Sequence, residues 1–217
     1  MSPPGPLPSQ RVVLADDHVI FRHGLRMILQ QQGLTIVGEA SEGRAAVKLC
    51  EAERPDVAIL DVAMPLLNGV DAAREIGRLC PDTRTVLLTM YAEEPYVLAS
   101  LRAGVAGYVL KSSAAADLIQ AIAAVLRGEI YLSPGVSRTV VQAFLAGSSV
   151  DDEPLSPRER EVLQLIAEGK NMKENGDLLG ISNRTAETHR ARIMDKLDIH
   201  ALPGLVRYAI KRGLIAS

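Results

Sequence analysis

The sequence predicts an α/β fold, a doubly wound parallel sheet of five strands, followed by a small all-α domain. Within residues 11–127, five short runs rich in Val, Ile and Leu alternate with five stretches whose apolar residues have helical spacing. From residue 154 onward no strand-like run occurs. Alternating strands and helices are typical of parallel sheets that helices cover on both faces. The chain has 217 residues, enough for two small domains.

The predicted strands are short and almost entirely apolar, as expected for strands buried on both faces. The stretches between them place apolar residues at i, i+3 and i+4, as amphipathic helices do. We expect the flavodoxin-like strand order 2-1-3-4-5. The strands are predicted at Val12–Ala15, Thr35–Glu39, Val57–Leu60, Thr85–Thr89 and Gly107–Leu110. The helical stretches are FRHGLRMILQQ, GRAAVKLCEAE, NGVDAAREIGRL, PYVLASLRAG and AADLIQAIAAVLRG.

The rest of the chain divides into a tail, a linker and a helical domain. Residues 1–10, MSPPGPLPSQ, are Pro-rich and are expected to form a flexible tail, without the basic start and apolar run of a signal peptide. Residues 128–153 are expected to be a linker with one short helix at Val136–Leu145. Residues 11–127 then form the sheet domain and residues 154–217 the helical domain.

Capping signals predict four helices in residues 154–217. Ser156, Pro157 and Glu159 form a helix start, in which Ser caps, Pro suits the first position and Glu completes a capping box. That helix ends at Gly169, and a second ends at Gly180. A third follows Ser182 and runs to about Leu197, and a fourth runs from near Pro203 to Gly213.

Composition indicates a globular protein with aliphatic cores. Trp is absent and aromatic residues are only 3% of the chain, so the cores must consist of Leu, Val, Ile and Ala. No apolar stretch is long enough for a membrane span. Cys50 and Cys80 form no metal motif and are interpreted as small buried hydrophobic residues in a reducing compartment, the cytoplasm.

Charge is distributed unevenly between the two predicted domains. Residues 154–217 hold 11 Lys and Arg against 8 Asp and Glu, a net charge of +3, which leaves −5 for residues 1–153. A mildly basic C-terminal domain is compatible with nucleic acid, although +3 alone is weak support.

Polar residues follow the predicted strands at one edge of the sheet. Asp16 and Asp17 follow the first strand, Asp61 the third and Lys111 the fifth, and Thr89 ends the fourth. The carboxyl ends of parallel strands form the ligand crevice of a doubly wound sheet, so these five side chains should converge. Any one of them alone would be interpreted as a loop former or helix cap. All five together, at the ends of four neighbouring strands, indicate a functional pocket.

The predicted pocket is suited to phosphoryl transfer. Three close carboxylates repel one another unless a cation joins them, and a hard divalent ion such as Mg²⁺ is the expected occupant. Asp61 can attack phosphorus and form an acyl phosphate. Lys111 and the Thr89 hydroxyl can contact the phosphoryl oxygens.

Residues 11–127 resemble the receiver domain of two-component response regulators. The resemblance rests on VVLADDH, LDVAMPLLNG, VLLTMY and GYVLK. It implies that Asp61 is the phosphoacceptor and that Asp16, Asp17 and the backbone carbonyl of Ala63 lie on the metal side. It also implies that Thr89 and Tyr108 form a switch pair, in which the hydroxyl moves toward the phosphate and the ring turns inward. Met90 is bulkier than the small residue that many receivers carry there, which leaves the lifetime of the phosphoryl group open.

Residues 154–217 resemble the LuxR-type output domain of the NarL/FixJ branch. The matching segments are LSPREREVLQLIAEGK, DLLGIS and RTAETHRARIMDKL. The Gly180-Ile181-Ser182 turn between two helices is typical of a helix-turn-helix, whose second helix enters the major groove. His189 is interpreted as structural. The candidates for phosphate contacts are Arg184, Thr185, Arg192 and Lys196, and those for base contacts are Glu187, Thr188 and Arg190.

Two departures from the output family concern its second and last helices. Asn175-Gly176 stands where the family has an apolar residue and Ala. A buried Asn loses packing and Gly costs a helix about 1 kcal/mol, so a weakened or distorted helix is predicted. Replacing both by Ile and Ala is expected to raise stability and DNA affinity together. Pro203-Gly204 opens the last helix, which commonly forms the dimer contact in this family.

The leading functional hypothesis is a DNA-binding transcriptional regulator that a histidine kinase phosphorylates on Asp61. The resemblance implies a two-fold symmetric DNA site, a homodimer when phosphorylated, and an unphosphorylated receiver that can mask the reading helix. RNA polymerase stays open as a further partner, and no membrane partner is expected. The alternative is a receiver-only signalling protein or a phosphate sink with an impaired DNA-binding domain. A free-standing phosphohydrolase is disfavoured, because no substrate-sized cleft or second acid/base pair is visible in the sequence, so the chain is not expected to be an enzyme.

Overall fold

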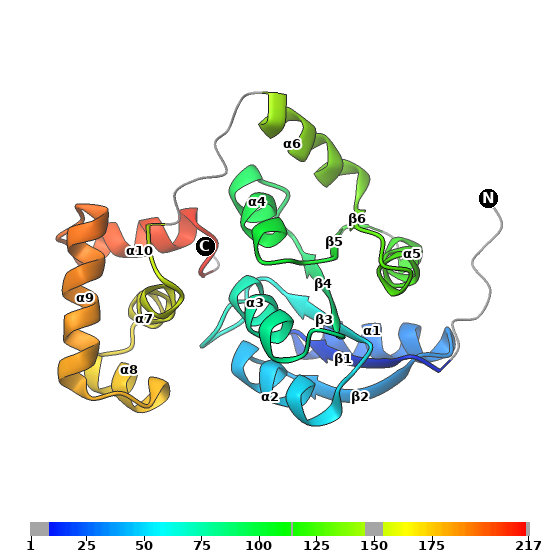
Figure 1. Ribbon diagram of the computed structural model, residues 1–217, viewed down its shortest axis with the longest axis horizontal. Helices are drawn as coiled ribbons and strands as arrows, with labels where there is room; N and C mark the ends of the chain where they lie inside the picture. The colour runs from blue at the N-terminus through cyan, green and yellow to red at the C-terminus, as the bar shows by residue number, and fades with distance from the viewer. Residues whose placement is uncertain (1–8, 114, 146–153, 216–217) are drawn as a thin grey trace.

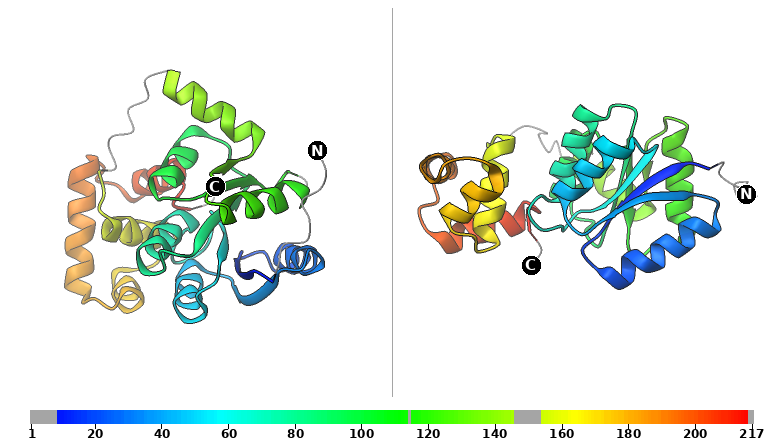
Figure 2. Two further views of the ribbon diagram at one scale, coloured as in Figure 1. Left: turned by 45° about the vertical axis from the view of Figure 1, so that its right-hand side comes forward. Right: turned by 90° about the horizontal axis from the view of Figure 1, so that it is seen from below.

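A computed structural model describes residues 9–113, 115–145 and 154–215. Two units stand side by side, a sheet flanked by helices and a bundle of helices (Figures 1 and 2). The predicted tail of residues 1–10 and the end of the predicted linker lie largely outside the described residues.

The sheet unit has the predicted parallel order with one strand added. The strand order is β2-β1-β3-β4-β5-β6, and every pairing is parallel. The first five strands agree with the predicted ranges to within one residue at each end. They are β1 (Arg11–Ala15), β2 (Thr35–Ala40), β3 (Val57–Asp61), β4 (Arg84–Thr89) and β5 (Gly107–Leu110).

The sixth strand, β6 (Tyr131–Leu132), falls in the segment predicted to be a linker. The Tyr131 N–H donates to the Ala106 carbonyl at 2.9 Å, and the Ser133 N–H donates to the Tyr108 carbonyl at 2.9 Å. Two residues are too few to show a strand pattern in sequence. The linker prediction therefore missed a segment that extends the sheet.

Helices cover both faces of the sheet (Figure 1). Alternate residues of a strand point to opposite faces, so Val13 of β1 packs with one cluster and Val12 and Leu14 with the other. The flanking helices are α1 (Val19–Gln31), α2 (Gly43–Glu53), α3 (Gly69–Leu79), α4 (Glu94–Arg102) and α5 (Ala115–Leu126). Helix α6 (Pro134–Leu145) begins two residues before the predicted helix and packs against α4.

The helical unit contains the four predicted helices. Ser156 caps the first with the predicted capping box, and a left-handed Gly180 ends the second. A separate apolar cluster, which includes Leu163, Ile193 and Leu205, forms its core. The helices are α7 (Pro157–Ala167), α8 (Met172–Leu179), α9 (Asn183–Leu197) and α10 (Leu202–Lys211).

The predicted distortion of the second helix was wrong, since α8 runs unbroken through Asn175 and Gly176. Asn175 is fully buried, and its amide donates to the carbonyls of Lys170 and Asn171 at 3.2 Å each. A Cβ on Gly176 would lie 2.7 Å from the carbonyl oxygen of Ile181 in the following turn. The glycine therefore permits a close approach of helix and turn, which propensity alone does not reveal.

We now expect Gly176→Ala to lower the free energy of unfolding by about 1–3 kcal/mol, because the added methyl overpacks against backbone. Gly77→Ala is the matched control, since Gly77 is also helical and has no atom within 4 Å of an added Cβ. Gly77→Ala should stabilise by about 1 kcal/mol. Urea unfolding measures both variants, and equal stabilisation by the two would contradict this view of α8.

Candidate functional site

The five predicted side chains do meet at the carboxyl edge of the sheet. Asp61 is the last residue of β3, and Thr89 is the last of β4. Asp16 directly follows β1, and Lys111 directly follows β5. Asp16, Asp61 and Thr89 are almost completely buried, whereas Asp17 is exposed. Backbone pairing continues to the site, since the Lys111 N–H donates to the Thr89 carbonyl at 2.7 Å.

Lys111 joins two of the carboxylates. Its Nζ lies 2.7 Å from Asp16 Oδ2 and 2.7 Å from Asp61 Oδ2. The ammonium also lies 4.7 Å from the centre of the Phe21 ring, a cation–π contact from α1 that the sequence analysis did not predict. The side chain of Lys111 is only 9% exposed, so little water competes for these contacts.

Burial and charge act against each other on these groups. Burial raises the pKa of Asp61, while the hydrogen bond and the charge of Lys111 lower it, and the net shift is upward. Burial lowers the pKa of Lys111, but hydrogen bonds and charge from Asp16 and Asp61 outweigh it, and the net shift is upward. Burial makes the ionised form of such a carboxyl group costly, and any further cation in the pocket would favour that ionised form.

The acidic groups lie close enough together to share a metal ion. One ligand atom from each of Asp16, Asp17, His18 and Asp61 lies within 4.8 Å of all the others. Ala63 is in the turn after β3, and its N–H donates to Asp61 Oδ1 at 3.4 Å. His18 was not among the predicted residues, and its Nδ1 lies 2.7 Å from Asp17 Oδ1. Carboxylate oxygens at this spacing suit a hard divalent cation.

The predicted switch residues are connected through Tyr91. Thr89 Oγ1 accepts a hydrogen bond from the Tyr91 N–H at 3.2 Å. The Tyr108 hydroxyl donates to the Tyr91 carbonyl at 2.9 Å, and the Tyr108 ring is fully buried, already turned inward. Burial raises the pKa of Tyr108 well above its usual range, so the hydroxyl stays a donor. Met90 is 69% exposed and lies outside the core.

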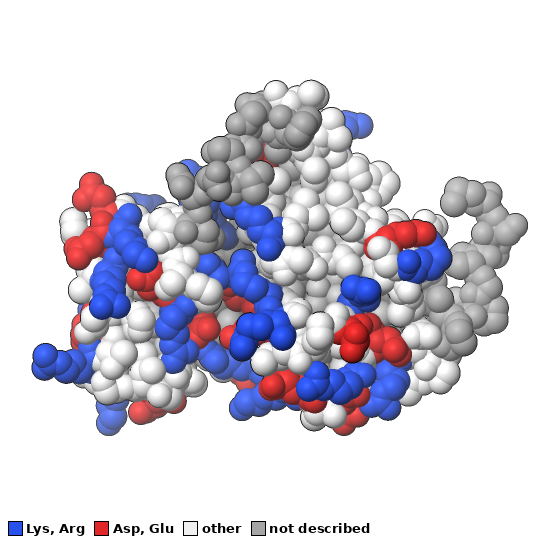
Figure 3. All heavy atoms as spheres, in the orientation of Figure 1, with Lys and Arg blue, Asp and Glu red and all other residues white. Residues whose placement is uncertain are grey.

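The predicted reading helix, α9, lies on the side of the helical unit that faces away from the sheet (Figures 1 and 2). Ser182 caps it by accepting from the Thr185 N–H at 3.0 Å. His189 is half-buried, in keeping with a structural role. In Figure 3, Lys and Arg side chains project from this side of the molecule. Five of the predicted DNA-contacting residues are exposed on the first three turns, and a sixth is half-buried; the exposed ones are Arg184, Thr185, Glu187, Thr188 and Arg192, and the half-buried one is Arg190.

Lys196 is the last of the predicted DNA contacts along α9. It lies four positions beyond Arg192, which is roughly 6 Å along a helix. Its Nζ lies 2.7 Å from Glu159 Oε2, so the ammonium already has a partner within the helical unit.

Among the described residues, none of the sheet unit covers α9, so the expected masking of the reading helix is absent from this arrangement. The helices that face the sheet unit are α7 and the end of α10 instead. The Tyr96 hydroxyl of α4 donates to the Ile210 carbonyl of α10 at 2.9 Å. Arg44 of α2 pairs with Glu161 of α7 at 2.8 Å.

Comparison with known proteins agrees with both units. The family model for the response regulator receiver domain matches residues 12–123, and that for bacterial regulatory proteins of the luxR family matches residues 153–209. The chain is a LuxR-type response regulator of the NarL/FixJ family. It therefore belongs to a family of phosphorylation-dependent DNA-binding transcriptional regulators, which are not catalytic enzymes.

Relatives of this response regulator match nearly its whole length. The oxygen regulatory protein NreC of Staphylococcus carnosus is 38% identical over 214 residues, which cover 94% of this chain and 99% of that protein. The response regulator UvrY of Escherichia coli O157:H7 is 34% identical over 206 residues, 94% of each chain.

A solved structure of RcsB from Salmonella enterica serovar Typhimurium is similar in fold. It has a TM-score of 0.63 and 32% identity, and the match covers 92% of this chain and 98% of that one. That RcsB structure is bound to the promoter P1flhDC in the presence of the phosphomimetic BeF₃⁻. A receiver domain implies a kinase partner for the response regulator described here.

The raised pKa of Asp61 predicts how stability depends on pH without metal. Ionising this carboxyl is harder in the folded than in the unfolded chain, so its contribution is largest below the ordinary pKa of 3.8 and is lost as the pH rises through the raised folded pKa. Asp61→Asn cannot ionise and should show a smaller fall in unfolding free energy over that range. Urea unfolding in EDTA at a series of pH values measures the difference between variant and parent, and identical profiles would contradict the pKa direction.

Proposed function

We propose that Asp61 accepts a phosphoryl group from the phosphohistidine of a sensor histidine kinase. One Asp61 oxygen attacks phosphorus in line as the phosphorus–nitrogen bond to the kinase histidine breaks, and the imidazole departs. The observation that carries this proposal is the position of Lys111, whose ammonium lies 2.7 Å from Asp61 and can contact a phosphoryl oxygen. Thr89 Oγ1 lies at the end of the neighbouring strand and can donate to another, with Tyr108 as its switch partner.

We infer that the metal in this pocket is Mg²⁺, held by Asp16, Asp17, Asp61 and the Ala63 carbonyl. Oxygen-only ligand sets suit this ion, and the carboxylate oxygens already lie within reach of one another. When bound, the ion neutralises charge on the transferring phosphoryl group. Asp16 and Asp61 would then need less charge compensation from Lys111, which frees the ammonium to face the phosphoryl group.

Mg²⁺ should therefore raise the melting temperature of the full chain, because an ion that binds only the folded state stabilises that state. Asp17→Asn should lose most of this shift, since Asp17 is an exposed member of the carboxylate cluster. Asp82→Asn, at an exposed Asp outside the cluster, is the control and should keep the shift. An equal Mg²⁺ response in all three proteins would contradict the proposed ligand set.

We further propose that the output domain binds a two-fold symmetric DNA site as a homodimer when Asp61 is phosphorylated. Arg184, Thr185 and Arg192 would contact phosphates, and Glu187, Thr188 and Arg190 the base edges. Six of the seven predicted contacts lie on the first three turns of α9, which the receiver leaves open. Lys196, paired with Glu159, is the least supported of the predicted phosphate contacts.

The proposed division of the chain follows the same assignment. Residues 11–127 are the receiver and 154–217 the output domain. Within the predicted linker of residues 128–153, β6 extends the receiver sheet and α6 packs against α4. We propose that the protein acts in the cytoplasm, where DNA and kinase domains are both accessible. None of the helices in the described part of the chain has the length and apolar character to cross a bilayer.

Genome-wide DNA capture with the full chain tests this function. Beryllofluoride with Mg²⁺ should enrich discrete, two-fold symmetric sites, and Asp61→Asn should lose this enrichment because it cannot hold the phosphoryl mimic. Arg190→Ala should lose the same sites, while Arg138→Ala in α6 serves as the control with unchanged enrichment.

The affinity for DNA should fall steeply with rising salt, as phosphate contacts require. Failure of the activated chain to enrich any site would instead favour the phosphate sink.

A further inference from the structure

The loop after β3, residues 62–68, is bound by side chains of the output domain. Gln164 of α7 is fully buried. Its Oε1 accepts from the Asn68 N–H at 2.8 Å and from Asn68 Nδ2 at 3.1 Å, and its Nε2 donates to the Met64 carbonyl at 3.0 Å. One output side chain thus contacts the receiver loop at two points, Met64 and Asn68.

Glu168 holds the middle of the same loop. Its Oε1 accepts from the Leu66 N–H at 3.0 Å and from Gln164 Nε2 at 2.8 Å. Leu66 has a φ of +66°, in the left-handed region that side chains with a Cβ rarely adopt. Its side chain packs against the apolar cluster of the output domain. Contacts from outside the receiver therefore support this loop conformation.

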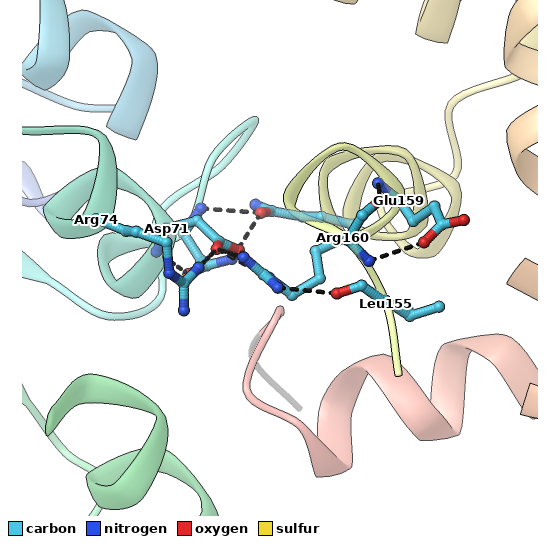
Figure 4. A network of polar contacts seen from close by, with 8 residues as sticks. Asp71, Arg74, Leu155, Glu159 and Arg160 are labelled. Carbon is cyan, nitrogen blue, oxygen red and sulfur yellow. Dashed lines mark hydrogen bonds and ion pairs between the residues drawn. The ribbon is translucent and has the colours of Figure 1, made fainter. Parts of the chain in front are cut away.

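A buried ion pair anchors α7 next to the loop (Figure 4). Asp71 of α3 and Arg160 of α7 point toward one another, with Nη2 2.7 Å and Nε 2.9 Å from Asp71 Oδ1. Both side chains are 7% exposed. Asn68 Nδ2 donates to Asp71 Oδ2 at 2.9 Å, which connects the ion pair to the loop.

The bound loop is part of the phosphoacceptor site. It begins directly after Asp61, and it contains Ala63, whose N–H donates to Asp61 Oδ1. A cavity of about 350 Å³ beside the site has Asp17 and residues 63–66 on one wall and Glu168, Lys170 and Ile215 on the other. The output domain therefore shapes both the loop and the space in front of it.

We propose that Gln164 and Glu168 are positioning residues for phosphoryl acceptance at Asp61. They hold the loop in the conformation that keeps Ala63 beside the acidic pocket, so the receiver site is complete only while α7 is docked. Coupling between two sites is reciprocal, so occupancy of the Asp61 pocket strengthens the docking of α7. This inference rests on the proposed phosphoacceptor function.

Calorimetric titration of the full chain with beryllofluoride in the presence of Mg²⁺ tests the inference. Gln164→Ala and Glu168→Ala should each weaken binding about five- to twentyfold, a usual range for coupling between sites. Glu168→Gln keeps an oxygen that can accept from Leu66 and should bind within about twofold of the parent. Gln120→Ala, at an exposed glutamine of α5, should not change the affinity.

The outcomes separate this inference from the proposed function. A parent protein that does not bind beryllofluoride would refute the phosphoacceptor role itself. A parent that binds, with Gln164→Ala and Glu168→Ala unchanged or tighter, would overturn only the positioning role. Melting curves check folding, and the Glu168→Ala and Glu168→Gln pair decides the question if Gln164→Ala does not fold, because Glu168 is less buried.

Discussion

The contact of Lys111 with Asp16 and Asp61 is the interaction on which the site depends. It draws together the ends of β1, β3 and β5, and it does so where water is nearly excluded. Burying three charges costs desolvation that their mutual attraction repays only in part. Such a cluster therefore contributes little to stability. It suits a site in which a metal ion or a phosphoryl group changes the balance of charge. The ammonium is already 2.7 Å from the carboxylate that accepts the phosphoryl group.

The rest of the fold fixes this contact in place. Alternating residues of each strand fill two apolar clusters, one on each face. A strand that slipped by one residue would move each side chain into the opposite cluster and disrupt the packing of both. The strand ends are thereby fixed in register, and the polar residues that follow them stay in one small volume. The loop after β3 connects Asp61 with α7 through the hydrogen bond between Asn68 and Gln164. Hydrogen bonds through the Tyr91 backbone connect Thr89 with Tyr108. Both sets of contacts begin at residues of the pocket.

The sheet order could be predicted because alternating strands and helices indicate a doubly wound sheet with a usual strand order. The pocket followed because parallel strands place their carboxyl ends at one edge, so Asp16, Asp61 and Lys111 were expected to lie close together. Other features depend on tertiary contacts with no local signal: the two-residue strand β6, Phe21 over the ammonium, and the contacts of Gln164 with a loop about 100 positions earlier in the chain. Gly176 shows how a correct helix propensity can give a wrong prediction. Glycine lowers the stability of an isolated helix, but here it leaves room for the backbone of the following turn, which a Cβ would contact. The masking of α9 that the family resemblance implied is not observed. The arrangement of the two units is set by interface side chains such as Arg160.

The most direct measurement locates the phosphoryl group by mass spectrometry after the full chain is incubated with phosphoramidate and Mg²⁺. The account predicts a single acyl phosphate in the peptide that contains Asp61, with none formed in EDTA or by the Asp61→Asn variant. Absence of any uptake by the parent chain, or undiminished uptake by Asp61→Asn, would contradict the central assignment.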